Sequence, residues 1–225
     1  MAEGPRKVNW FAIWVSVGVV VALVVVAILV VTLSNQSSGP QPDQAPSASN
    51  IDSETGAILF GTGPDQVDTY VDFMCPYCAQ FEQAEGETIS QLVSDEQITL
   101  SVYPVAILDR LSQGTQYSSR SASAMYSVAE ADPDHAYAFL RELFAQQPPE
   151  GSEGLSNEEI VDVARAAGVT MTPELEESIL SSRYLDFAQR TALPQEARGT
   201  PTLVVNGEIV PVTFDAQVDI VARLQ

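Results

Sequence analysis

The feature that most constrains this chain is a pair of cysteines separated by two residues. Cys75 and Cys78 are the only two cysteines among its 225 residues. A disulfide that closes so short a loop adds little stability, because the chain entropy that it removes from the unfolded state grows with loop length. The pair is therefore placed for chemistry. It can exchange electrons as a dithiol and a disulfide, or bind a soft metal as two thiolates.

The rest of the composition disfavours the metal site. Zinc in a structural site takes four ligands, but no third cysteine exists and His135 is the only histidine. We therefore predict no metal and no other cofactor. A metal-handling pair and an inert structural disulfide remain as the less favoured alternatives.

The residues around the pair predict a strand that leads directly into a helix. Residues 66–73 read as a strand in which Thr69, Val71 and Phe73 share one face at period two. The pattern becomes helical after Pro76, a residue type that suits the first turn of a helix. Cys75 is therefore expected at the helix N-terminus.

A cysteine at that position is chemically activated. Unpaired backbone N–H groups and the helix dipole both favour a thiolate there, and such cysteines have pKa values of roughly 3.5 to 7.5 against about 8.5 when free. We expect Cys75 to be the nucleophile and good leaving group. Cys78, one turn later, is expected to be the shielded, resolving thiol.

The remaining pattern predicts further strands, a helical block and a C-terminal hairpin with a helix. The Asn206-Gly207 dipeptide is typical of the tight turn of a hairpin. In chain order the expected elements are a strand at 57–60, a strand at 98–105, helices across about 113–193, a hairpin of strands 202–205 and 208–212, and an amphipathic helix at 214–224.

Two separated motifs resemble one known family. The heptapeptide DFMCPYC at 72–78 resembles the active site of the DsbA-like branch of the thioredoxin superfamily, and GTPTLVVNG at 199–207 is similar to that family's cis-proline loop and hairpin. The resemblance implies an α/β thioredoxin fold over residues 54–225, with a helical subdomain inserted at about 113–193.

The resemblance also implies roles for the loop before the hairpin. It implies that Pro201 is cis and packs against the two cysteines, and that Thr200 offers its backbone to the substrate chain. Phe73 and Met74 are expected to form an apolar rim around the sulfurs, where an unfolded substrate rests.

Departures from the family pattern predict a moderate oxidant. Asp72, Pro76 and Tyr77 are expected to support the cysteines and tune their redox chemistry. Tyr77 replaces the histidine of the strongest oxidants, and Thr69 stands where many relatives carry a buried acid. Cys75 is therefore expected to be activated mainly by the helix terminus.

The N-terminus predicts a membrane anchor. Residues 8–33 carry no charge, and residues 10–33 as a helix would extend about 36 Å, enough for a bilayer core of roughly 30 Å. Arg6 and Lys7 precede the apolar run, which predicts that residues 1–9 are cytoplasmic and that the rest of the chain is extracytoplasmic. A cleaved signal peptide is the alternative, but its apolar region is usually only about 7–15 residues long.

Residues 34–53 are expected to be a flexible linker, because residues 34–50 are rich in Ser, Pro, Gln and Gly. The formal net charge of −20 argues against binding nucleic acid or anionic lipid. No dimerisation segment is evident, so we expect a monomer.

These observations lead to one functional hypothesis. The chain is expected to be a single-pass, membrane-tethered thiol–disulfide oxidoreductase that oxidises thiols of reduced, exported proteins. The resemblance implies a bacterial source and a quinone-linked membrane reoxidant of the DsbB or vitamin K epoxide reductase type. A reductase or isomerase of the same fold, or a non-enzymatic thioredoxin-fold module that binds partners or metal, remains the alternative.

Overall fold

The computed structural model describes residues 44–225 of the protein. The predicted cytoplasmic segment 1–9, the predicted transmembrane helix 10–33 and the first part of the linker lie outside the described residues. Across 44–225, none of the helices combines the length and the apolar character needed to span a membrane.

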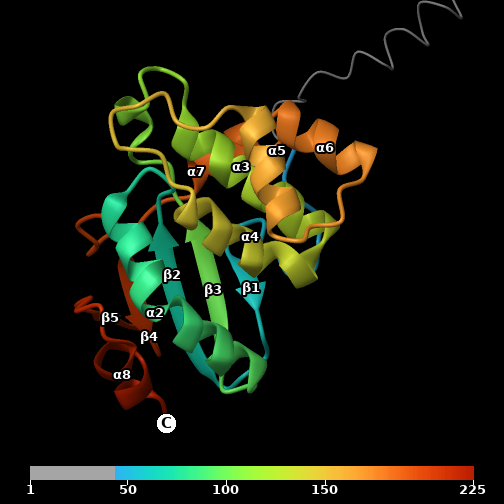
Figure 1. Ribbon diagram of the computed structural model, residues 1–225. Coiled ribbons are helices and arrows are strands. Elements are labelled where there is room, and N and C mark those ends of the chain that lie inside the picture. The colour runs from blue at the N-terminus through green and yellow to red at the C-terminus, as the bar shows by residue number, and fades with distance from the viewer. Residues whose placement is uncertain (1–43) are drawn as a thin grey trace, which may run out of the picture. The chain divides into compact units, whose positions relative to one another are not determined.

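The centre of the fold is a mixed five-stranded sheet with the strand order β1-β3-β2-β4-β5. Its strands are β1 (Ile58–Phe60), β2 (Asp65–Val71), β3 (Ile98–Pro104), β4 (Thr202–Val205) and β5 (Glu208–Val210). The neighbours β2 and β3 are parallel, whereas the other pairs are antiparallel. A parallel pair needs a long crossover, and helix α2 (Pro76–Ser94) provides it (Figure 1).

The predicted helical block lies between β3 and β4 in the chain. It consists of the 3₁₀ turn η1 (Asp109–Leu111) and helices α3 (Tyr117–Ala131), α4 (Pro133–Ala145), α5 (Asn157–Ala166), α6 (Pro173–Leu180) and α7 (Leu185–Arg190). The prediction of helices across 113–193 is thereby confirmed.

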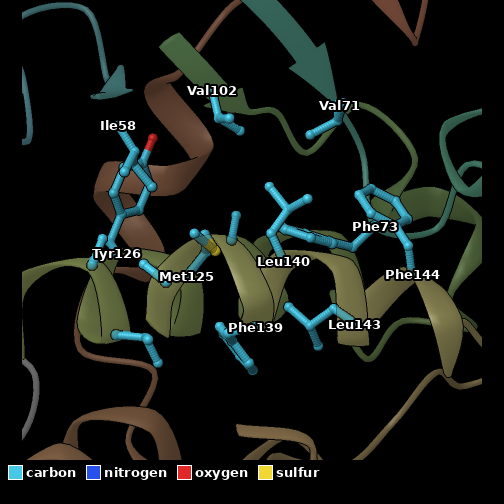
Figure 2. Close-up of a cluster of buried hydrophobic side chains, with 14 of the residues drawn as sticks. Ile58, Val71, Phe73, Val102, Met125, Tyr126, Phe139, Leu140, Leu143 and Phe144 are labelled. Atoms are coloured by element: carbon cyan, nitrogen blue, oxygen red, sulfur yellow. The ribbon is translucent and has the colours of Figure 1, made fainter. Parts of the chain in front are cut away.

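The core joins the sheet to this block. Figure 2 shows Val71 of β2 and Val102 of β3 facing Leu140 of α4, and each of these side chains is at most 1% exposed. Phe73 continues the buried face of β2 and stacks on Phe144 of α4, with ring centroids 5.0 Å apart. The loop that leads to Cys75 is therefore packed directly against the helical block.

The hairpin forms as predicted, with Asn206 at φ 50° and Gly207 at φ 83° in its turn. The single C-terminal helix predicted at 214–224 is wrong. The structure has α8 (Ala216–Asp219) and the 3₁₀ turn η2 (Val221–Arg223) instead. The buried Asp219 carboxylate accepts hydrogen bonds from the backbone N–H groups of Thr213 (2.6 Å) and Phe214 (3.1 Å), and Phe214 has φ 64°, so the chain folds back before a helix can begin.

The second half of the predicted linker is attached to the domain. Asn50 Nδ2 donates to the carbonyl of Ala129 (3.0 Å), and the Ser47 N–H donates to the Glu130 carboxylate (2.9 Å), so both bond to the end of α3. Ile51 is buried and forms a bridge with Ile58. Few side chains make these contacts, which is why composition alone predicted a flexible linker up to residue 53.

Candidate active site

The structure places Cys75 at the start of α2, as the sequence predicts. Cys75 is the N-cap residue, with φ −80° and ψ 116°, and Pro76 occupies the first helical position. The Cys75 N–H donates to the Asp72 carbonyl at 2.9 Å, and the Cys78 N–H donates to the Cys75 carbonyl at 3.0 Å. This tight turn directs the first N–H groups of the helix toward the cysteine.

The second sequence motif meets the first at the sulfur. The Thr200–Pro201 peptide bond is cis, as expected. The Cys75 thiol donates to the Thr200 carbonyl at 3.3 Å, although the two residues lie 125 positions apart in the chain. The cis-proline loop therefore lies against the nucleophile candidate.

The two thiols differ strongly in acidity. A side-chain hydrogen bond from Cys78 is the main cause that lowers the pKa of Cys75 to about 6, although burial opposes it. A side-chain hydrogen bond with Thr200 and the backbone N–H groups of Cys78 and Tyr77 lower it further. Burial raises the pKa of Cys78 well above its ordinary value. Both cysteines are free thiols. Near neutral pH, Cys75 is ionised and Cys78 stays protonated, which is the division expected of an attacking and a resolving thiol.

Asp72 organises the loop in front of Cys75 from a fully buried position. One carboxylate oxygen accepts from the Met74 N–H (2.9 Å) and the Ser118 hydroxyl (2.6 Å), and the other accepts from the Leu108 N–H (2.9 Å). Burial is the main cause that raises the pKa of Asp72. The expected support role thus takes the form of a bridge between β2, the segment after β3 and α3.

The expectation of an apolar rim at Phe73 and Met74 is wrong, because both side chains are fully buried. The strand alternation carries Phe73 onto the core face, and the chain turns inward before Cys75. The exposed apolar group beside the sulfurs is Tyr77, which is 63% exposed. It borders a pocket of about 470 Å³ whose lining includes Tyr77, Thr200, Pro201, Ile209, Val212 and Phe214.

The geometry of the two motifs agrees with the comparisons to known proteins. A family model described as thioredoxin matches residues 61–222. The chain belongs to the thioredoxin family. A search of curated proteins found no match for it.

Several solved structures resemble this one over most of its length. Oxidised DsbA of Mycobacterium tuberculosis is 32% identical, with a TM-score of 0.62 over 70% of this chain and 86% of that one. Reduced DsbG of the same organism is 30% identical, with a TM-score of 0.60 over 77% and 83%. MdbA of Actinomyces oris, a thiol-disulfide oxidoreductase, is 25% identical, with a TM-score of 0.60 over 75% and 83%. The expected resemblance to DsbA-like thiol–disulfide oxidoreductases is confirmed.

This thioredoxin-family domain has an active-site contact that the sequence analysis missed. The side-chain amide of Gln147, in the loop after α4, donates to the carbonyls of Phe73 and Cys75, each at 2.9 Å. Gln147 lies 72 residues after Cys75, and its neighbours Gln146 and Pro148 give no local signal of a bond to the active-site loop. Only the tertiary packing of α4 on this loop reveals it.

Two buried acids on α2 were also missed. Thr69 of β2 is buried where the family resemblance implied an acid, and Glu82 and Glu85 are buried on α2. Burial raises the pKa of Glu82 to about 7 and that of Glu85 to about 8. Glu85 lies in the apolar stripe that begins at Cys78, so helical periodicity could have revealed it.

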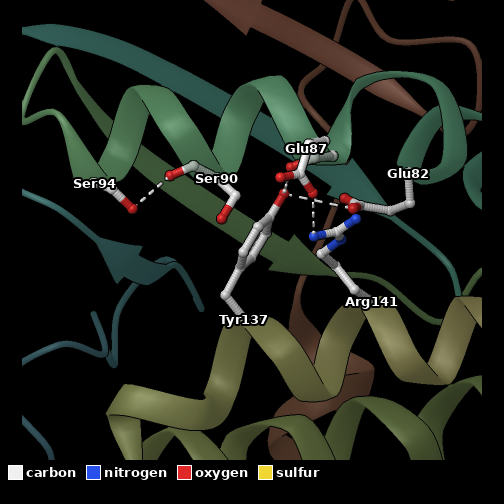
Figure 3. A network of polar contacts seen from close by, with 7 residues as sticks. Glu82, Glu87, Ser90, Ser94, Tyr137 and Arg141 are labelled. Carbon is white, nitrogen blue, oxygen red and sulfur yellow. Dashed lines mark hydrogen bonds and ion pairs between the residues drawn. The ribbon is translucent and has the colours of Figure 1, made fainter.

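Glu82 lines a cleft of about 880 Å³ between α2, α4 and the end of α5. Figure 3 shows the polar contacts of Glu82 and its neighbours, in which the Tyr137 hydroxyl lies 3.5 Å from the Glu82 carboxylate and Arg141 pairs with Glu87 at 3.1 Å. No group of three His, Cys, Asp or Glu side chains within the described residues could hold a metal ion.

Proposed function

We propose that the protein is a membrane-tethered, extracytoplasmic oxidase that transfers its Cys75–Cys78 disulfide to thiols of exported proteins. The observation that carries this proposal is the asymmetry of the pair. Cys75 has a pKa of about 6 at the N-terminus of α2, whereas Cys78 is buried and has a raised pKa.

The direction of electron flow follows from the acidity of Cys75. A low thiol pKa stabilises the reduced, thiolate form of the pair, which makes the corresponding disulfide a stronger oxidant. Because Cys75 is ionised near neutral pH, it is also a good leaving group. Such a pair tends to oxidise the thiols of other proteins and does not tend to reduce their disulfides.

The reaction consists of two thiol–disulfide exchanges. A substrate thiolate attacks Cys75 Sγ, the bond between the two cysteines breaks, and Cys78 leaves with the electron pair and takes up a proton. A second substrate thiolate then attacks the substrate sulfur of the mixed disulfide and releases the Cys75 thiolate. The substrate loses two electrons and gains one disulfide, while the enzyme gains two electrons and ends as a dithiol.

The surface beside Cys75 suits an extended substrate chain. The Thr200 carbonyl lies 3.3 Å from the Cys75 sulfur, and Thr200, Pro201 and the exposed Tyr77 line one pocket. A reduced, unfolded polypeptide can lie along this loop with one of its cysteines at Sγ. This arrangement supports the expected role of Thr200 in substrate binding, and we propose that Tyr77 contributes to the same surface.

The apolar run at 10–33 and the preceding basic residues support tethering to a membrane with the domain outside the cytoplasm. The enzyme needs an acceptor for the two electrons that each cycle leaves on Cys75 and Cys78. We assign this role to a quinone-linked membrane protein of the DsbB or vitamin K epoxide reductase type.

The decisive experiment uses the full chain, oxidised and purified in detergent, with a reduced multi-disulfide protein as substrate. We expect stoichiometric formation of substrate disulfides and reduction of the Cys75–Cys78 pair. Reshuffling of scrambled disulfides without net oxidation would favour an isomerase. A pair that stays mostly oxidised in strongly reducing glutathione buffer, with a potential near that of cytosolic thioredoxin, would contradict the oxidase. The absence of both activities together with stoichiometric metal uptake would favour a metal-handling module.

A further inference from the structure

The C-terminal end of α4 and the loop after it contact the active-site loop, which leads from β2 to Cys75, through two residues. Phe144 stacks on Phe73 at 5.0 Å between ring centroids. Three residues later, Gln147 Nε2 lies 2.9 Å from the Phe73 carbonyl and 2.9 Å from the Cys75 carbonyl. The helical block therefore holds the loop on both sides of Met74.

The geometry of Gln147 suits this double contact. An amide nitrogen carries two N–H donors, so the two carbonyls can each receive one of them. The Gln147 backbone N–H donates to the Phe144 carbonyl at 3.2 Å, which fixes the start of the loop after α4. Pro148 and Pro149 follow and restrict the backbone further. The side chain is thus directed at the active-site loop by its own backbone.

The Cys75 carbonyl is the group whose orientation matters most for the sulfur. A peptide unit is planar, so the Cys75 carbonyl and the Pro76 nitrogen rotate together about the Cα–C bond of Cys75. That rotation would move the first turn of α2 relative to Sγ. The same turn supplies the backbone N–H groups of Tyr77 and Cys78 that stabilise the thiolate.

We propose that Gln147 is a positioning residue for the Cys75 nucleophile, because it holds the peptide that joins Cys75 to helix α2. The inference rests on the proposed thiol chemistry of Cys75 and adds a contribution from the helical block. Without the amide, the Cys75 carbonyl keeps its bond from the Cys78 N–H within the turn but loses its hold on the rest of the domain. The hydrogen bonds from the Tyr77 and Cys78 N–H groups to the Cys75 thiolate then form for a smaller fraction of the time. The reduced form of the pair is therefore less stabilised.

The test compares three variants of the full chain with the wild type. Gln147→Met keeps the length of the side chain and removes both donors, and Gln147→Ala removes the side chain. The matched control is Gln146→Ala, because Gln146 is exposed and donates instead to the Glu142 carboxylate at 2.7 Å. The ionisation of Cys75 is followed by thiolate absorbance and by alkylation rate against pH, and the disulfide is equilibrated with glutathione.

We expect both Gln147 variants to raise the pKa of Cys75 by about half to one unit, which corresponds to a roughly three- to tenfold less oxidising disulfide. The Gln146 variant should match the wild type. If both Gln147 variants titrate like the wild type while their thermal unfolding temperature falls, Gln147 is a structural contact only and the proposal is overturned.

Failure of the proposed function gives a different result. In that case the wild type itself would show an ordinary thiol pKa at Cys75, before any variant is compared. If neither Gln147 variant folds, the side-chain amide resonance of Gln147 is followed by NMR in the wild type against pH. If the chemical shift of the Gln147 amide changes with pH along with the ionisation of Cys75, the proposal is supported. If the chemical shift stays constant while Cys75 ionises, the proposal is overturned.

Discussion

Helix α2 carries four buried acidic groups, two thiols at its start and two carboxyls further along. At the start, donors surround Cys75, and its pKa falls to about 6 despite burial. In the middle, Glu85 is buried, and no donor within the described part of the chain reaches either of its carboxyl oxygens. Burial is the main cause that raises its pKa to about 8, and the Asp219 carboxylate adds to the rise because it accepts a hydrogen bond from the protonated group and repels the charged one. The two regions share one helix and similar burial.

The difference lies in the supply of donors. A helix terminus leaves its N–H groups unpaired, and they stabilise an anion, whereas the middle of a helix uses every N–H within its own backbone. Burial by itself penalises the charged form. An acidic side chain on α2 therefore has a lowered pKa only at the start of the helix. Cys75 is ionised there, whereas Glu85 stays protonated in the middle of the same helix.

The largest effect expected is that of removing the activated thiol. Cys75→Ser should abolish substrate oxidation, because a serine hydroxyl cannot form the exchangeable sulfur bond. The measurement is disulfide formation in a reduced multi-disulfide substrate. Oxidation that persists in this variant would show that the first turn of α2 is not the reactive region.

The second prediction concerns the donor from Cys78. The alkylation rate of wild-type Cys75 should rise with pH through about 6 and then level off, because the thiolate is the reactive form. Cys78→Ala removes the hydrogen bond that lowers the pKa of Cys75 most, so the midpoint should move upward by about one unit. When it is given a disulfide-bonded substrate, the variant should also accumulate mixed disulfides, because Cys75 attacks the substrate disulfide, one substrate thiolate leaves, and no second enzyme thiol resolves the product. An unchanged midpoint would assign the activation to the backbone alone.

The third prediction concerns Glu85 in the middle of α2, where burial disfavours the charged carboxylate. The unfolded chain ionises Glu85 near pH 4.5, whereas the folded protein keeps it protonated up to about pH 8, so Glu85 costs stability increasingly as the pH rises between these values. Glu85→Gln should therefore raise the free energy of unfolding by about 1–3 kcal/mol at pH 8 and hardly change it at pH 4.

The control for this third prediction is Glu87→Gln. Glu87 is exposed and pairs with Arg141 at the surface, so its loss should change the free energy of unfolding by less than about 1 kcal/mol at either pH. Denaturant unfolding of the wild type and the two variants, each at both pH values, provides the comparison. Equal effects of the two substitutions at pH 8 would contradict a buried, neutral Glu85.

The smallest effect is expected at the exposed edge of the first turn. Tyr77→His adds an imidazole beside the Cys75 sulfur, and its protonated form should lower the pKa of Cys75 by a further half unit or so. The substitution should make the disulfide a slightly stronger oxidant in glutathione equilibrium. Because Tyr77 is mostly exposed, stability should hardly change, and a weaker oxidant would show that the tyrosine itself contributes to activation.

Local signals were sufficient to predict the framework of the site. The alternation before Cys75, the proline after it and the Asn206-Gly207 turn each determine local structure, so the strand, helix and hairpin could be predicted from short segments. The meeting of Cys75 with Thr200 came from the family resemblance, since nothing local joins positions 125 apart.

What the sequence could not reveal depends on long-range packing. The bonds of Gln147 exist only because α4 ends beside the active-site loop. The C-terminal helix was predicted too long, because the hydrogen bonds of Asp219 to upstream N–H groups leave no trace in periodicity. For Phe73 the local pattern was sufficient, because its place in the strand alternation already indicated burial. The expectation of an exposed rim was wrong because it disregarded that pattern.

Helix α3 links the N-terminal segment to the chemistry. Near its end it holds Asn50 and Ser47, and near its beginning Ser118 bonds to Asp72 below the active-site loop. Between Ser118 and Glu130 the helix rises about 18 Å. The active-site loop and the segment that contains Ser47 and Asn50 are therefore held at opposite ends of α3. A force on the segment that contains Ser47 and Asn50 is therefore transmitted along α3 to Asp72 and the loop before Cys75.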